Sequence, residues 1–153
     1  QLTFDPAATQ NLDFTNQITI TGDFTIALRL DIDVVGNTLL ADNDAENEWL
    51  RTINSTTLRV KIGGSFVNIS LDAPNIWGDN YLVLTRASDV ISIWFDGVLQ
   101  ADNETLDGSV LIDNFGVRKT DNNPYSGLLM EMQIYNCSNA ELTANVISSI
   151  KDI

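Results

Sequence analysis

The stretch from Asn80 to Leu99 constrains the fold of this chain more than any other segment. It contains two apolar runs rich in β-forming residues, Tyr81–Arg86 and Val90–Phe95, and the second run ends at Asp96-Gly97. An Asp-Gly pair next to apolar runs is a strong signal for a tight β-hairpin. We therefore expect antiparallel strands here, joined by short turns.

Side chains alternate between the two faces of a strand, so these runs also predict what each face does. One face carries only large apolar residues: Leu82, Leu84, Ile91, Ile93 and Phe95. The opposite face carries Tyr81, Val83, Thr85, Ser92 and Trp94. The first face predicts one wall of a buried core. The second is not plainly polar, so we expect either a further covering layer or contacts to a ligand.

The rest of the chain repeats this strand pattern. Residues Asp23–Val35 alternate well enough to predict one long, half-buried strand. Shorter strands are expected at Gln1–Phe4, Gln17–Ile20, Thr38–Ala41, Trp49–Ile53, Thr57–Ile62, Phe66–Leu71, Val98–Ala101, Val110–Ile112, Phe115–Val117 and Tyr125–Tyr135. Roughly a dozen short strands at this spacing are typical of an all-β, antiparallel two-sheet sandwich.

The C-terminal segment changes to a helical pattern. Ser138-Asn139-Ala140-Glu141 resembles a capping box, and Leu142, Val146 and Ile150 recur at helical spacing. We expect one short helix at this end of the chain.

Composition narrows the possible functions. The 153 residues are expected to form a single domain, 1–153, with a net charge of −13. So acidic a chain is a poor partner for nucleic acid, and no apolar run is long enough for membrane insertion. The chain contains no His, which excludes His-based catalysis and His–zinc sites. The lone Cys137 is expected to be a small buried residue.

Five short motifs occur in an order that resembles one family. They are Asp23–Ile26, Trp77 ahead of Tyr81–Arg86, Ile91–Gly97, Tyr125–Leu129, and Gln133–Asn136 with Leu142. This order resembles the laminin-G-like, concanavalin A-like jelly-roll domains of lectins, pentraxins, bacterial adhesins and phage virion proteins. The resemblance covers nearly the whole chain. It implies a jelly-roll sandwich and specifies the fold rather than the ligand.

Two loops are rich in oxygen ligands. The acidic tract Asp42–Glu48 offers oxygen ligands at alternating positions, as a hard cation such as Ca²⁺ requires, although a solvated acidic turn would look the same. Its candidate metal ligands are Asp42, Asp44 and Asn47. Asp121, Asn122 and Asn123 precede Pro124 and offer contacts to a metal or to sugar hydroxyls, although a tight turn also favours these residues. We expect loops of this kind to meet at one rim of the sandwich.

Aromatic rings are the candidate stacking partners for a sugar, whose C–H faces lie flat on them. Trp94 lies on the second face of its strand, Trp49 follows the acidic loop, and Tyr125 follows the Asn-rich loop. Each is a candidate ligand contact, with core packing as the alternative. Trp77 is expected to pack.

A hydrolase needs a pair of carboxylates at a fixed separation. Asp31 and Asp33 alternate on one strand and Glu131 stands alone on another, and none has an evident partner. We therefore expect no enzyme. The favoured hypothesis is a non-catalytic surface module that recognises a glycan or a protein partner. The alternative is a structural phage virion protein, a capsid-decoration or tail-associated domain that binds virion subunits or its own copies. Both hypotheses place the domain in the extracellular space, at a cell surface or on a virion.

Overall fold

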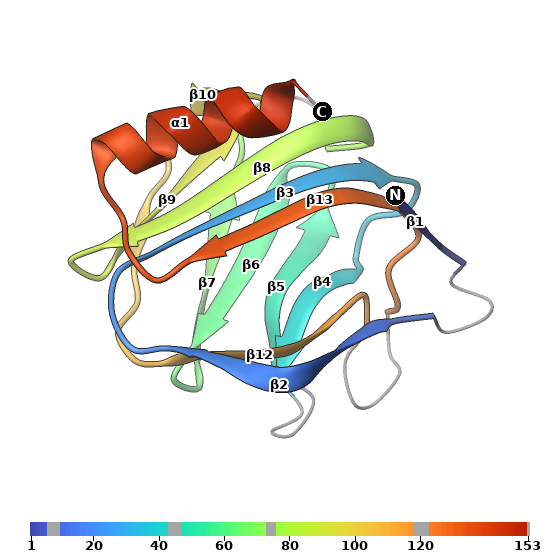
Figure 1. Ribbon diagram of the computed structural model, residues 1–153, viewed down its shortest axis with the longest axis horizontal. Helices are drawn as coiled ribbons and strands as arrows, with labels where there is room; N and C mark the ends of the chain where they lie inside the picture. Colours follow the sequence, from blue (N-terminus) through green and yellow to red (C-terminus); the bar gives the residue numbers. More distant parts are fainter. Residues whose placement is uncertain (6–9, 43–46, 73–75, 118–122, 153) are drawn as a thin grey trace.

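The computed structural model describes residues 1–5, 10–42, 47–72, 76–117 and 123–152, with the backbone alone for residues 47 and 48. Two sheets face each other, and a helix lies outside them (Figure 1). The seven-stranded sheet has the order β1-β13-β3-β8-β9-β10, with β11 paired to β9. The six-stranded sheet has the order β2-β12-β4-β5-β6-β7. All pairings between described strands are antiparallel, which confirms the predicted all-β sandwich.

The strands are β1 (Leu2–Phe4), β2 (Leu12–Ile20), β3 (Phe24–Ile32), β4 (Thr38–Asp42), β5 (Asn47–Asn54), β6 (Thr57–Ile62), β7 (Ser65–Ser70), β8 (Gly78–Ala87), β9 (Val90–Phe95), β10 (Val98–Leu99), β11 (Glu104–Thr105), β12 (Val110–Phe115) and β13 (Gly127–Tyr135). The helix, α1, spans Ala140–Lys151. In the part of the chain that the structure describes, no helix is both long and apolar enough to cross a bilayer.

The central hairpin forms as its sequence predicts. Strand β9 has the expected bounds, and two-residue turns at Ser88-Asp89 and Asp96-Gly97 join β8, β9 and β10. All four turn residues have positive φ, from 49° at Asp96 to 79° at Gly97, as a hairpin turn that follows the strand twist requires. The five residues of the predicted core face are all buried between the sheets.

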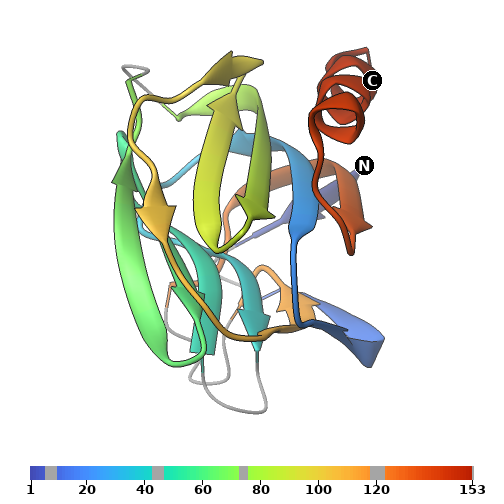
Figure 2. The ribbon, with the colours of Figure 1, turned by 90° about the vertical axis from the view of Figure 1, so that its left-hand side faces the viewer.

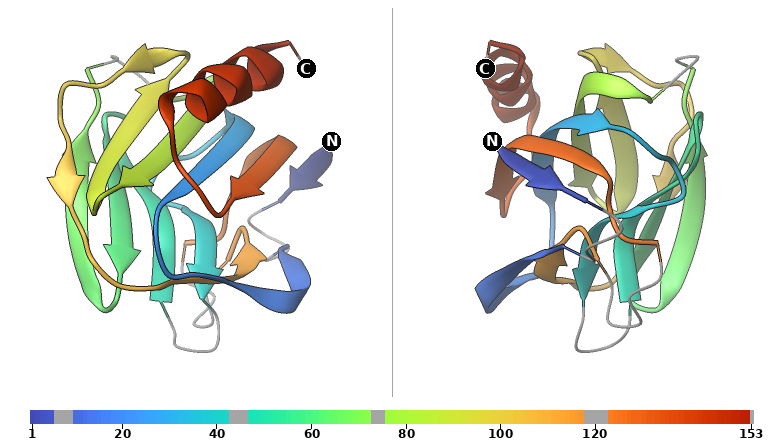
Figure 3. Two further views of the ribbon diagram at one scale, coloured as in Figure 1. Left: turned by 60° about the vertical axis from the view of Figure 1, so that its left-hand side comes forward. Right: turned by 90° about the vertical axis from the view of Figure 1, so that its right-hand side faces the viewer.

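The second face of the hairpin is covered by α1. Val146 and Ile150 of the helix pack on Ala27 and Val83, with Trp94 at the margin of this cluster. Two views turned from that of Figure 1 place α1 outside the seven-stranded sheet, away from the six-stranded sheet (Figures 2 and 3). The sequence left open whether this face is covered by a further layer or contacts a ligand. Over β3 and β8 it is covered by a further layer, the helix.

Several sequence-based boundaries need correction; β2, for example, begins at Leu12 rather than at Gln17. The helix is capped by Asn139, whose Oδ1 accepts a hydrogen bond from Leu142 N at 2.9 Å, so it begins one residue later than a cap at Ser138 would give. The two short strands expected around Asp113 are one strand, β12, with a register shift between Ile112 and Asn114. Strand β3 ends at Ile32, which leaves Val34 45% exposed.

Candidate functional site

The outer face of the seven-stranded sheet is organised in rows that run across neighbouring strands. Strand register places Ala27, Val83, Trp94 and Leu99 side by side on β3, β8, β9 and β10. The neighbouring row contains Thr25, Thr85 and Ser92. An apolar row therefore runs beside a hydroxyl row. The helix covers the β3 and β8 end of the apolar row, whereas Leu99 at the sheet edge is 54% exposed.

A groove lies where the N-terminal half of α1 meets β8 and β9. We call it the Trp94 groove; its volume is about 390 Å³. Its walls include Trp94, Thr85 and Ser92 from the sheet, and Ser138, Asn139 and Ile147 from the helix side. This volume falls within the range of about 300–1,000 Å³ that is usual for small-ligand sites. Trp94, a predicted contact, is thus a partly exposed ring in a concave setting.

Two hydroxyls in the sheet wall of the Trp94 groove, those of Thr85 and Ser92, have no internal partner among the described residues. On the helix side, by contrast, Thr143 Oγ1 donates to the carbonyl of Asn139 at 2.9 Å, and Asn139 Oδ1 accepts from Leu142 N. Thr85 is only 3% exposed, and the structure records no hydrogen bond between its hydroxyl and another described residue. The same holds for the hydroxyl of Ser92. Because both hydroxyls line the groove and neither is paired with a described residue, they are open to hydrogen bonds with water or a ligand there. The side chains that line the groove are uncharged.

Trp49 and Asp42 meet at a second, smaller hollow of about 210 Å³, which Lys61 and Ser109 also line. Trp49 itself is only 2% exposed and packs edge-on against Phe24, with ring centroids 5.7 Å apart. Its indole N–H is buried and has no partner among the described residues. The ring therefore presents no open face, and the prediction that Trp49 stacks a sugar is wrong: it is a core residue.

Tyr125 is also a core residue rather than a stacking platform. Its side chain is fully buried against Phe4 and Phe115. Its hydroxyl lies 2.9 Å from the carbonyl of Asp31 and 3.0 Å from that of Leu128, so it can donate to either. Burial, and then the negative charges nearby, raise the pKa of the phenol far above its ordinary value. The predicted ligand role of Tyr125 is therefore corrected.

The predicted oxygen-rich loops are described only in part. Asp42 ends β4, is 4% exposed, and accepts a hydrogen bond from Gln17 Nε2 at 3.2 Å. Asn123 is exposed, and its carbonyl accepts from Thr38 N at the other end of β4. Asp44, Asp121 and Asn122 lie outside the described residues, as does the side chain of Asn47. Among the described residues, no group of three metal-ligating side chains forms. Calcium binding therefore stays a prediction.

The carboxylates weighed for hydrolysis do not line either hollow. Ser126 Oγ lies 3.4 Å from Asp33 Oδ2, and Gln133 Nε2 donates to Glu131 Oε1 at 3.3 Å. Asp31 stands opposite Asp79 across β3 and β8, and Asp79 is bound by Arg29.

Two further predictions are wrong, and one contact was not foreseen. Cys137 is exposed rather than buried, and Trp77 is 40% exposed rather than packed. Phe66, at 55% exposed, lies under the guanidinium of Arg59 on β6, a pairing that the sequence analysis missed. The alternation of Arg59 and Lys61 with apolar residues along β6 could have predicted that both basic side chains lie on the outer face of the sheet.

Comparison with solved structures shows which known folds this architecture resembles. Domain 4 of AbnA, a GH43 extracellular arabinanase from Geobacillus stearothermophilus solved in complex with arabinotriose, has a TM-score of 0.62 at 16% identity, covering 87% of this chain and 66% of that one. Mouse laminin alpha1 domains LG4-5 give 0.54 at 13% identity, covering 81% of this chain and 40% of that one. The fold is concanavalin A-like and laminin G-like. The resemblance read from the sequence motifs is thereby confirmed.

A third structure with the concanavalin A-like fold is a putative carbohydrate binding protein from Bacteroides ovatus. Its TM-score is 0.59 at 17% identity, covering 88% of this chain and 45% of that one. This chain spans less than two thirds of the length of these three structures. No protein-family model and no curated protein matches the sequence. The alternative of a structural virion protein gains no support from these structures.

Proposed function

We propose that this chain is a non-catalytic glycan-binding module that holds a neutral sugar in the Trp94 groove. The observation that carries the proposal is the partly exposed Trp94 ring in a groove whose wall hydroxyls, Thr85 and Ser92, lack internal partners. The concanavalin A-like fold that this chain shares with a domain solved with arabinotriose supports the same class of ligand.

The chemistry of the groove matches that of a sugar. A pyranose or furanose ring has apolar C–H faces and a rim of hydroxyls that both donate and accept hydrogen bonds. The indole of Trp94 can take a C–H face, while Thr85 and Ser92 can pair with hydroxyls at its rim. No charged side chain lines the groove, so a neutral sugar fits better than an acidic one.

Two observations favour binding without catalysis. Asp31, Asp33 and Glu131 lie outside the walls of the groove, so no carboxylate pair faces a sugar held there. The chain also has no His to move a proton. A module of this kind would bind extracellular or cell-surface glycans, in keeping with the extracellular arabinanase whose domain it resembles.

The test is calorimetric titration of the chain with neutral oligosaccharides, such as those of arabinan, xylan, glucan and mannan. We expect Trp94→Ala to weaken binding roughly tenfold or more, equivalent to about 1.4 kcal/mol, through loss of the stacking ring. Trp77→Ala removes an exposed tryptophan elsewhere and should leave affinity unchanged.

Trp94 also packs beside α1, so Trp94→Ala could weaken the fold. Thr85→Val is the second variant, because it replaces a groove hydroxyl by a methyl group of similar size. We expect it to lower affinity while the chain stays folded, as judged by the near-ultraviolet circular dichroism spectrum. Absence of binding to every neutral glycan at millimolar concentration would refute the proposal. Equal affinity for Trp94→Ala and the original chain would refute the groove as its site.

A further inference from the structure

A cluster of basic side chains lies on the outer face of the six-stranded sheet, opposite the sheet that carries the Trp94 groove. Buried Leu58, Val60 and Ile62 alternate along β6 with Arg59 and Lys61, which therefore face outward. Arg51 on β5 is directly opposite Arg59, and on β7 Asn68 is opposite Arg59 while Phe66 is opposite Lys61. We call Arg51, Arg59, Lys61, Phe66 and Asn68 the Arg59 surface.

Stability alone does not favour the clustering of these basic side chains. The chain has 21 acidic and only 8 basic residues, yet Arg51, Arg59 and Lys61, three of those eight, gather on two adjacent strands. Like charges directly opposite each other in a sheet are destabilising. A local rule broken in this way is often found at a functional site.

Arg59 is fixed in place without an acidic partner. Its Cζ lies 4.4 Å from the centroid of the Phe66 ring, and its Nε donates to Asn68 Oδ1 at 3.0 Å. No carboxylate of a described residue contacts its guanidinium, so the two terminal nitrogens keep their donors. Arg51 and Lys61 make other contacts; Arg51 Nε, for example, donates to the carbonyl of Gly36 at 3.1 Å. Arg59 is therefore the residue of this surface that is best placed to anchor a ligand.

We propose that the Arg59 surface is a second ligand site, which binds an acidic glycan through a carboxylate or sulfate group. A stacked guanidinium with two open N–H₂ groups is pre-organised to hold an oxyanion by two parallel hydrogen bonds. Lys61 adds positive charge beside it, and Phe66, 55% exposed, offers apolar contact to a sugar ring. The choice of a sugar over an acidic peptide rests on the proposed glycan-binding function.

The overall acidity of the chain does not oppose such a site at short range. At physiological ionic strength the Debye length is about 8 Å, so carboxylates elsewhere on the molecule are largely screened. The ligand then experiences mainly the basic side chains next to it. High salt should weaken the contact itself, which gives the site a measurable signature.

The test is titration of the chain at physiological salt with four probes: polygalacturonate, dextran sulfate, neutral dextran and polyglutamate. We expect binding to polygalacturonate, dextran sulfate or both, weakening at high salt, and none to neutral dextran. Arg59→Gln should weaken it about tenfold or more. Lys151→Gln makes the same change in net charge at an exposed position and should have no effect. Arg59→Lys, which keeps the charge without the planar fork, should restore binding only in part.

Three results would overturn the proposal: no binding to either acidic glycan, no effect of Arg59→Gln, or an equal loss in Lys151→Gln. Equal, Arg59-dependent binding of polyglutamate would overturn the assignment to a sugar. Trp94→Ala separates the two sites, because it should leave binding of the acidic probes unchanged. If Arg59-dependent binding is found while every neutral glycan fails, the Arg59 surface stands and the proposed groove function falls.

Discussion

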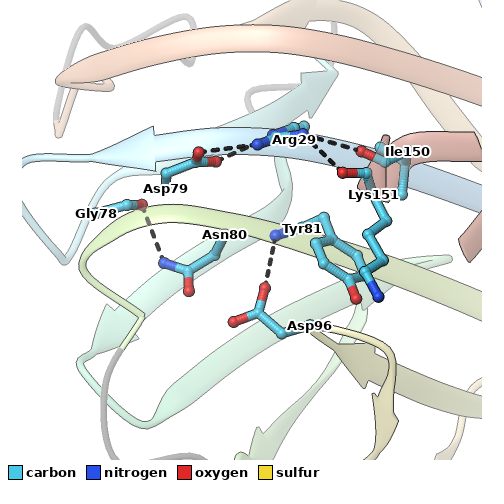
Figure 4. A network of polar contacts seen from close by, with 8 residues as sticks. All are labelled: Arg29, Gly78, Asp79, Asn80, Tyr81, Asp96, Ile150 and Lys151. Carbon is cyan, nitrogen blue, oxygen red and sulfur yellow. Dashed lines mark hydrogen bonds and ion pairs between the residues drawn. The ribbon is translucent and has the colours of Figure 1, made fainter. Parts of the chain in front are cut away.

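Arg29 and Asp79 form a bidentate ion pair that links β3 to β8. Arg29 Nε and Nη2 lie 3.1 and 2.9 Å from the two carboxylate oxygens of Asp79. Arg29 Nη1 donates to the carbonyl of Lys151 at 3.1 Å and lies 3.4 Å from that of Ile150 (Figure 4). The last carbonyls of a helix lack internal partners and favour a cation. Arg29 therefore holds the end of α1 on the sheet, and the other end of that helix forms one wall of the Trp94 groove.

This ion pair predicts a pH-dependent contribution to stability. The hydrogen bond from Arg29 lowers the pKa of Asp79, against a smaller opposing effect of burial. A carboxylate with a lowered folded-state pKa stabilises the fold above its unfolded pKa of about 3.9, and this contribution is lost as the pH falls. Because Asp79 is half exposed, we expect Asp79→Asn to cost only about 0.5–1 kcal/mol at neutral pH.

Urea unfolding of both chains at neutral and strongly acidic pH measures this difference. The gap between Asp79→Asn and the original chain should close in acid, where both side chains are neutral. Asp89→Asn, a change at an exposed hairpin turn, is the matched control and should shift stability little at either pH. A gap that persists unchanged in acid would show that the Arg29 pair is not its source.

Tyr125 predicts the opposite dependence at alkaline pH. Burial raises its pKa, so the folded chain keeps the phenol protonated where an unfolded chain releases the proton. Its contribution to stability is therefore present below the unfolded tyrosine pKa of about 10 and is lost as the pH rises above it. Phenolate absorbance should show a step that coincides with alkaline unfolding. That step should disappear in Tyr125→Phe, which should also lower stability by about 1 kcal/mol. Full ionisation of all three tyrosines in the folded chain would contradict this assignment.

Ile93 tests the facing of the central hairpin. It is fully buried between the sheets, opposite Leu84 in the register of β8 and β9. Ile93→Ala should lower the free energy of unfolding by about 2–5 kcal/mol, the usual cost of such a truncation in a core. Val98→Ala, at a position 64% exposed, should change it by less than about 0.5 kcal/mol. Comparable losses for the two variants in urea unfolding would mean that the packing is misassigned.

The hairpin could be predicted because its information is local. Alternation fixes which side chains share a face, and Asp96-Gly97 suits a turn with positive φ. What covers the second face could not be read in this way, because it depends on α1 packing across Ala27 and Val83 from a distant part of the chain. Arg86 shows the same limit: it is 1% exposed, and carbonyls of Gly22 and Gly108 accept its hydrogen bonds.

The candidate site was predictable only in part. Trp94 lies on a regular strand, so its face followed from alternation, and the structure places it in a groove. Trp49 lies near the start of β5, where a register shift against β4 interrupts the alternation and both Trp49 and Leu50 are buried. Tyr125 lies before β13 begins, where strand alternation does not set the direction of a side chain. Their burial depends on Phe24 and Phe4, which lie far away in the sequence. Nearness to a polar loop was therefore a poor guide to exposure.

Calcium binding at the acidic tract remains to be tested, and Asp42 is its best-described residue. Its carboxylate is nearly buried at the end of β4 and accepts a hydrogen bond from Gln17. A cation bound by the folded chain alone raises the melting temperature in proportion to the logarithm of its concentration above Kd. We therefore expect millimolar Ca²⁺ to raise the melting temperature more than Mg²⁺ does, since clustered carboxylates suit the larger ion. Asp42→Asn should abolish the rise, whereas the exposed control Asp89→Asn should keep it. No rise with Ca²⁺, or a rise that survives Asp42→Asn, would exclude a site built on this carboxylate.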